Sequence, residues 1–106
     1  MPLLACLCRD LFERARIDAL AGALGLSSVM WNDDLAIQPP EAGSWLVADL
    51  LEPGAIEVAL RARDAGWQVL AYGPHVRADL FADARAAGLE ACARSALDRI
   101  LAARAC

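Results

Sequence analysis

One local joint occurs three times along the chain: a helical stretch, then a glycine, then an apolar residue that leads into a short apolar run. The three joints are Ala23-Leu24-Gly25-Leu26, Ala65-Gly66-Trp67 and Ala87-Gly88-Leu89. Glycine directly after a helix supplies the left-handed C-cap, because it tolerates a positive φ without steric cost. The joints therefore predict three places where a helix passes into a strand.

Between the joints, the spacing of apolar residues alternates between that of helices and that of strands. Helical spacing of three or four runs through 17–24, 56–63 and 80–87. Five short apolar runs bounded by turns are typical of buried parallel strands. The predicted strands are Leu3–Cys8, Ser28–Trp31, Trp45–Ala48, Val69–Tyr72 and Ala91–Ala93, and a last helix is predicted over Leu97–Ala105.

This alternation predicts an α/β fold, a doubly wound parallel sheet of five strands with right-handed crossovers and helices on both faces. The whole chain, 1–106, is the size of one such domain. A helix is expected between the second and third strands, but Gln38–Ser44 contains two prolines and a glycine, which exclude a regular helix. At most Asp33–Ile37 forms a turn, so we expect that helix to be short or missing.

The charge composition narrows the classes of function. All ten basic residues are arginines, and neither lysine nor threonine occurs, which excludes a P-loop lysine, a Schiff base and a threonine nucleophile. The net charge is −4 and the arginines are scattered, whereas nucleic-acid binding needs clustered cations. The apolar start is too short for a signal peptide or a membrane span, and four cysteines without metal-type spacing suggest free thiols. We expect a cytoplasmic protein with no nucleic-acid or membrane partner.

Acidic residues stand at the ends of two predicted strands. Arg9-Asp10 follows the first strand, and Asp49 ends the third, with Pro53 four residues later. Together with the five alternating strands, this placement resembles the receiver domain of bacterial response regulators, a flavodoxin-like sheet of order 2-1-3-4-5. The resemblance covers nearly the whole chain apart from the missing helix. It implies that Asp49 is the phosphoacceptor position and that Asp10 and Asp49 would hold Mg²⁺.

Other positions depart from the receiver pattern. Receivers carry an acidic pair after the first strand, a serine or threonine after the fourth, and a lysine followed by a proline after the fifth. Here Arg9 puts a positive charge at one of the two acidic positions, and Gly73 replaces the hydroxyl residue. Arg94-Ser95 replaces the lysine and the proline. Ala91 stands where many receivers carry a switch aromatic residue. The resemblance therefore implies an atypical receiver, a pseudo-receiver, with much of the phosphorylation set changed.

The same residues can be interpreted without the family. Asp10 and Asp49 should converge at the topological switch point, where open α/β folds bind ligands. Two carboxylates favour Mg²⁺, whereas Arg9 and Arg94 could neutralise them in a closed salt-bridge network that needs no ion. Asp10 could instead cap the helix that follows it. His75, the only histidine, lies after the fourth strand near the same edge and would respond to pH, bind a metal or simply pack.

A contact surface is predicted on the helix after the fourth strand. Arg77, Phe81 and Arg85 recur at i, i+4 and i+8, opposite an expected core stripe of Leu80 and Ala84. An outward aromatic side chain between two arginines has the composition of a protein interface; the alternative is a single, partly exposed phenylalanine without a role. We expect a protein partner, for which a second copy of this chain is one option.

The leading hypothesis is a receiver-like signalling or protein-interaction module that has lost standard aspartyl phosphorylation and acts by binding a partner, without enzymatic activity or a cofactor. The alternative is an unconventional receiver still phosphorylated at Asp49 with Mg²⁺, in which Arg94 substitutes for the lysine. A flavodoxin-like cofactor binder ranks third, because the loop 9–13 offers acids where a flavin phosphate needs glycine, serine or threonine donors.

Overall fold

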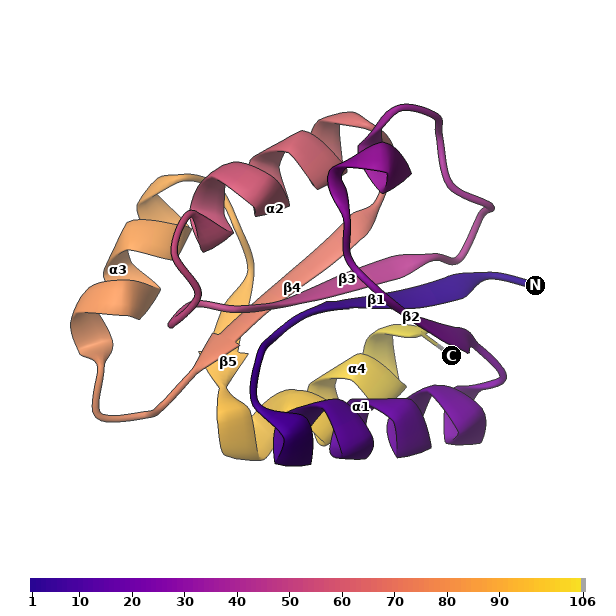
Figure 1. Ribbon diagram of the computed structural model, residues 1–106. Helices are drawn as coiled ribbons and strands as arrows, with labels where there is room; N and C mark the ends of the chain where they lie inside the picture. Colours follow the sequence, from indigo (N-terminus) through magenta and orange to yellow (C-terminus); the bar gives the residue numbers. More distant parts are fainter. Residues whose placement is uncertain (106) are drawn as a thin grey trace.

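The computed structural model describes residues 1–105, which form an open five-stranded parallel sheet with helices on both faces (Figure 1). The strand order is β2-β1-β3-β4-β5, so the predicted fold class and order are confirmed. The predicted strand ends differ from the observed ones by at most one residue. The strands are β1 (Leu3–Leu7), β2 (Ser27–Met30), β3 (Trp45–Asp49), β4 (Gln68–Gly73) and β5 (Ala91–Ala93).

Two helices lie on each face of the sheet (Figure 1). One face carries α1 (Leu11–Leu24) and α4 (Leu97–Ala105), and the other carries α2 (Ala55–Asp64) and α3 (Ala78–Ala86). The three junction glycines adopt positive φ, at 72° in Gly25, 109° in Gly66 and 86° in Gly88, as the repeated joint predicts. Within residues 1–105, no helix combines the length and the apolar character that a membrane crossing needs.

Alternate side chains of the strands build one hydrophobic core on each face. Leu4 and Cys6 of β1, and Cys8 directly after it, point toward α1 and α4, whereas Ala5 points toward the face of α2. Every residue of β3 is buried, as expected for a central parallel strand. This alternation places Asp49, the last residue of β3, on the same side as Trp45 and Val47, the α1–α4 side.

The segment between β2 and β3 has no regular helix, as its prolines predict. It contains a single 3-10 turn, η1 (Asp33–Ala36), followed by an irregular loop. The sheet beneath is covered by Trp31 and Trp67, whose rings meet edge to face with centroids 5.3 Å apart. The indole N–H of Trp67 donates a hydrogen bond to the carbonyl of Leu35 in η1 at 3.1 Å. The aromatic pair therefore takes up the space that a helix would otherwise fill.

The prediction that Phe81 points outward from α3 is wrong. Its side chain is only 9% exposed and packs in a core cluster with Leu50, Ala59 and Leu89. The ring lies next to Gly73, where an added Cβ would be 3.8 Å from Phe81 Cε1. Burying this large apolar ring is favoured over exposing it, and Leu80 is left half-buried beside it.

The two arginines of the predicted contact surface are exposed but already engaged. Arg77 pairs with Asp79 at 3.0 Å. The guanidinium of Arg85 lies 5.6 Å from the centroid of the Phe81 ring and donates to the carbonyl of Ala91 at 3.3 Å. Arg85 therefore covers the ring rather than standing beside an exposed one, and the three residues do not form the predicted aromatic patch.

Candidate functional site

The residues singled out in the sequence gather at the edge of the sheet where the strands end. Asp49 and Gly73 are the last residues of β3 and β4, and Arg94 directly follows β5. Asp10 stands between β1 and α1. Because all five strands are parallel, these four positions share the carboxyl edge, where ligands of doubly wound folds bind.

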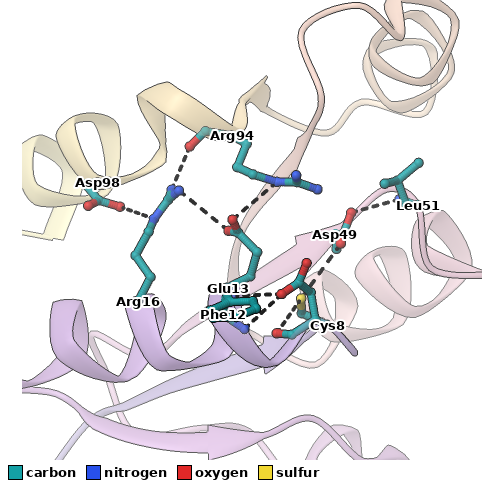
Figure 2. Close-up of polar contacts among 9 residues, drawn as sticks. Cys8, Phe12, Glu13, Arg16, Asp49, Leu51, Arg94 and Asp98 are labelled. Atoms are coloured by element: carbon teal, nitrogen blue, oxygen red, sulfur yellow. Dashed lines mark hydrogen bonds and ion pairs between the residues drawn. The ribbon is translucent and has the colours of Figure 1, made fainter.

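Asp49 is held inside the site by two hydrogen bonds (Figure 2). Its carboxylate is 4% exposed; Oδ1 accepts from the backbone N–H of Leu51 at 2.9 Å, and the thiol of Cys8 donates to Oδ2 at 3.8 Å. The backbone bond fixes the turn that leaves β3. Oδ1 therefore has a backbone donor of its own, whereas Oδ2 shares the single thiol proton of Cys8 with the carbonyl of Asp10, which also lies 3.8 Å from the sulfur.

A buried polar pair lies beneath Asp49. Cys8 and Tyr72 are both buried, and the Tyr72 hydroxyl makes no hydrogen bond to nitrogen or oxygen within residues 1–105. Burial is the main cause that raises the pKa of the Cys8 thiol, and burial together with the Cys8 thiol raises the pKa of Tyr72 far above its ordinary value. Both groups stay protonated at neutral pH, so the buried floor of the site carries no charge from Cys8 or Tyr72, and only the Cys8 thiol donates to Asp49.

Asp10 is the N-cap of α1. Its Oδ1 accepts from the backbone N–H groups of Phe12 at 2.8 Å and Glu13 at 3.2 Å. This confirms the interpretation that the residue caps the following helix. The carboxylate is exposed and makes no ion pair within the described residues.

Arg9 does not contact Asp10 or Asp49 in the way the sequence suggests. Its side chain is 82% exposed, and Nε lies 3.0 Å from Oε2 of Glu52, while its backbone N–H donates to Oε1 of the same residue at 2.7 Å. Glu52 lies in the loop after β3, and its carboxylate accepts from both the side chain and the backbone of Arg9. The predicted salt-bridge network among Arg9, Arg94, Asp10 and Asp49 is therefore wrong.

Arg94 pairs with α1 instead of Asp49. Its Nε is 3.5 Å from Oε1 of Glu13, and Oε2 of Glu13 is 3.6 Å from Arg16 (Figure 2). Arg16 also pairs with Asp98 at 3.1 Å and donates to the carbonyl of Arg94 at 2.6 Å. Figure 2 shows Arg16 standing between Asp98 and Glu13, so these contacts tie the first turns of α1 to the start of α4.

Sequence reasoning missed Cys8, Glu13, Arg16 and Glu52. Glu13 carried a detectable pattern, because it stands three residues after the cap and three before Arg16, the spacing of neighbours on one helix face. Cys8 could be placed on a strand but not beside Asp49, since that contact joins residues 41 apart. Glu52 lies in a loop, where no periodicity indicates which way a side chain points.

Gly73 and His75 occupy the last part of the edge. A Cβ at Gly73 would lie 3.7 Å from Cβ of Leu50, an ordinary contact, so the absence of a hydroxyl side chain here is not imposed by lack of space. His75 is exposed in the loop between β4 and α3 and lines a cavity with Arg16 and Arg94. No contact brings it to Asp49.

Exposed apolar side chains surround the same edge. Leu11 and Phe12 begin α1, Leu51 follows β3, and Val76 follows β4, and all four are exposed, Phe12 to 89%. We call these four residues the apolar rim. They belong to the three connections that leave the carboxyl ends of β1, β3 and β4, so the rim frames the site.

Mg²⁺ is the ion that the receiver fold implies at this edge of the sheet. Within residues 1–105, no three histidine, cysteine, aspartate or glutamate side chains come together as a ligand set. Asp10 uses Oδ1 as a helix cap, and both oxygens of Asp49 accept hydrogen bonds. Mg²⁺ is held in proteins by one or two carboxylates in nearly ideal octahedral oxygen geometry. Here both candidate carboxylates already accept backbone hydrogen bonds, so their arrangement does not favour the ion.

Comparison with known proteins gives structural likeness without sequence likeness. No protein-family model and no curated protein matches the chain. Among solved structures, a response regulator from Thermotoga maritima matches with a TM-score of 0.72 and 13% identity, over 98% of this chain and 93% of that one. A response regulator receiver protein from Burkholderia phymatum matches with a TM-score of 0.68 and 22% identity, over 89% and 83%.

A third match carries a metal of its own. The receiver domain of a sensor histidine kinase from Pseudomonas aeruginosa PAO1, solved with a magnesium ion coordinated in its active site cleft, has a TM-score of 0.68 and 15% identity, over 94% of this chain and 93% of that one. At these identities the matches show the fold: the chain has the flavodoxin-like architecture of receiver domains.

Proposed function

We propose that this chain is a receiver-like signalling module that has lost standard aspartyl phosphorylation and acts by binding a protein partner, without catalysing a reaction of its own. The observation that carries the proposal is the state of Asp49. A phosphoacceptor must present a free carboxylate oxygen to an incoming phosphoryl group, whereas Asp49 is buried and accepts from Cys8 and from the backbone of Leu51.

The neighbours of Asp49 support the same conclusion. The cation after β5, Arg94, is engaged with Glu13 on α1, and its planar guanidinium differs in shape and hydration from the compact ammonium of a lysine. Gly73 supplies no hydroxyl at the end of β4. The residues that would stabilise a phosphoryl group on Asp49 are thus replaced, and Arg94 makes its ion pair with Glu13 rather than with Asp49.

The apolar rim supports a binding role. Exposed leucine, phenylalanine and valine side chains that lie together at one edge are typical of contact surfaces, whereas isolated ones carry no meaning. The four residues of the rim border the site from the start of α1 and from the loops after β3 and β4. We assign the partner contact to this rim rather than to the helix of Arg77, Phe81 and Arg85.

The test is exposure of the intact protein to Mg²⁺ with a small phosphodonor, acetyl phosphate, and separately with beryllofluoride. We expect no phosphoryl adduct by intact mass spectrometry and no change in backbone amide chemical shifts around Asp49. The matched control is Asp49→Asn, which should behave as the native chain does. A stoichiometric adduct that Asp49→Asn abolishes would overturn the proposal and favour the unconventional receiver.

Calorimetry with Mg²⁺ addresses that alternative directly. An unconventional receiver needs Asp10 and Asp49 to bind the ion, so heat of binding at millimolar Mg²⁺ that either Asp10→Asn or Asp49→Asn removes would support it. We expect no such heat, because one aspartate caps α1 and the other is hydrogen-bonded on both oxygens.

Sedimentation velocity tests a second copy of the chain as the partner. Association that increases with protein concentration and is weakened by Phe12→Ser would identify the rim as a self-association surface. A monomer at all concentrations would direct the search to a different protein.

A further inference from the structure

A cavity of about 300 Å³ lies beside the candidate site, between α1, the loop after β4 and the 3-10 turn η2 (Arg94–Ala96) that precedes α4. Its polar lining side chains all offer N–H or O–H groups, and no carboxylate lines it. The lining residues are Arg16, Pro74, His75, Arg94 and Ser95. A concave site with two guanidinium groups, an imidazole and a hydroxyl is suited to an oxyanion, since each can donate to a negatively charged oxygen.

Arg94 is the group with donors to spare. Its Nε is buried without a hydrogen bond, and the 3.5 Å approach to Glu13 is a long ion pair. Among the contacts of residues 1–105, its two terminal nitrogens make none. Arginine recognises phosphate through two parallel N–H groups, a geometry that a long, single contact with a carboxylate does not use.

The side chain of Arg16 lines the cavity and is held in place by its own contacts. It contacts Glu13 of α1, Asp98 of α4 and the carbonyl of Arg94 in the turn before α4, so three partners set its position. The bond to the Arg94 carbonyl also fixes the backbone from which the Arg94 side chain extends. Preorganised donors lower the entropy lost on binding. The two carboxylates that balance these arginines, Glu13 and Asp98, do not line the cavity.

We propose that this cavity binds a small phosphate-type dianion non-covalently, through the terminal nitrogens of Arg94 with Ser95 and His75 as further donors. Inorganic phosphate and small phosphomonoesters share this chemistry. Because Asp49 does not line the cavity and no bond to it forms, the inference is independent of the proposed function. Bound phosphate would compete with Glu13 for Arg94 and so loosen the tie between α1 and α4.

The test is calorimetric titration of the intact protein with inorganic phosphate at constant ionic strength, with chloride as the reference anion. We expect saturable binding of one phosphate. Arg94→Gln should weaken it at least about tenfold, the size of a lost charge-assisted pair of hydrogen bonds. The matched control is Arg99→Gln, which removes one exposed cation of α4 that does not line the cavity.

A second variant should change the phosphate affinity in the opposite direction to Arg94→Gln. Glu13→Gln removes the competing carboxylate, so phosphate affinity should rise several-fold even though the ion pairs with Arg16 and Arg94 are lost. A merely structural role of these residues would lower affinity in both variants. Circular dichroism confirms that each variant is folded before titration.

Two further measurements separate this inference from the proposed function and distinguish the possible ligands. Asp49→Asn should bind inorganic phosphate as the native chain does. If Asp49 accepts a phosphoryl group from acetyl phosphate, with acetate leaving, the proposed function fails while the phosphate titration still tests this cavity. Phenyl phosphate binding as tightly as inorganic phosphate or better would identify a monoester as the source, and weaker binding would favour free phosphate. No saturable binding, or binding that Arg94→Gln leaves unchanged, overturns the inference.

Discussion

Phe12 and Phe81, the two phenylalanines of the chain, lie in opposite environments. Phe12 is 89% exposed in the apolar rim, whereas Phe81 is 9% exposed in the core under α3. We expect Phe81→Ala to lower the free energy of unfolding by about 3 kcal/mol, because it leaves a cavity. Phe12→Ala should change it by less than about 0.5 kcal/mol.

Urea unfolding, followed by circular dichroism, measures both changes. Phe12→Ala is the matched control, since it removes the same ring from the surface. Similar losses of stability in the two variants would mean that Phe12 is covered in solution, which would itself point to association through the rim.

At this scale the sequence predicts where residues lie but not which of them meet. Asp10, Asp49, Gly73 and Arg94 reach one edge, because their positions follow from strand ends. The pairings do not follow, because several carboxylates and guanidinium groups compete over a few ångströms: Arg94 meets Glu13 rather than Asp49. Such choices depend on loop geometry that leaves no pattern in the sequence.

Among the elements, α1 has one glycine inside it and one directly after it, and the two are under opposite conformational constraints. Gly22 lies inside the helix, and an added Cβ would meet nothing within 4 Å; Gly25 is the C-cap with φ of 72°. Gly22→Ala should stabilise the protein by about 0.5 to 1 kcal/mol, by lowering the entropy of the unfolded chain and favouring the helix. Gly25→Ala should destabilise it by about 1 kcal/mol, because alanine pays for a left-handed conformation.

Thermal and urea unfolding of the two single variants check this pair. The same substitution in one element must give changes of opposite sign. A stabilising Gly25→Ala would contradict the left-handed cap and hence the joint on which the fold prediction is based.

The elements were predictable where local chemistry decides them and ambiguous where it does not. Glycine caps, apolar strand runs and the prolines of 38–44 each act within a few residues, so strands, junctions and the missing helix could be predicted. The buried face of α3 could not, because its sequence is rich in alanine and allows two apolar stripes, through Leu80 or through Phe81. Packing against Gly73 and Leu50 settles the choice.

The stability of the whole molecule should fall in alkaline solution. Burial is the main cause that raises the pKa of the Cys6 thiol from 9.0 to about 12. Between these values the unfolded chain releases the proton and the folded chain keeps it, so the unfolded state binds fewer protons and unfolding becomes easier as pH rises. Below 9.0 this group has no effect on the pH dependence. Burial raises the pKa values of Cys8 and Cys92 as well, which act in the same direction.

Urea unfolding at a series of pH values from 8 upward, with reductant present, measures how steeply the free energy of unfolding falls with pH. Cys6→Ala is less stable overall but should lose less of its remaining stability between pH 9.0 and about 12, because one of the coupled protons is gone. Identical slopes in the native chain and the variant would show that Cys6 does not resist ionisation.

The edge-to-face pair of Trp31 and Trp67 gives one face of the sheet a spectroscopic signal that the other face lacks. These rings, with centroids 5.3 Å apart, are close enough for their electronic transitions to couple, which produces a paired band in circular dichroism. Trp45, the third tryptophan, packs in the core on the opposite face. Loss of the coupled band therefore reports disruption under η1 and α2, while the fluorescence of a Trp31→Phe, Trp67→Phe variant reports the core under α1 and α4. One chain thus carries an intrinsic spectroscopic probe for each half of its interior.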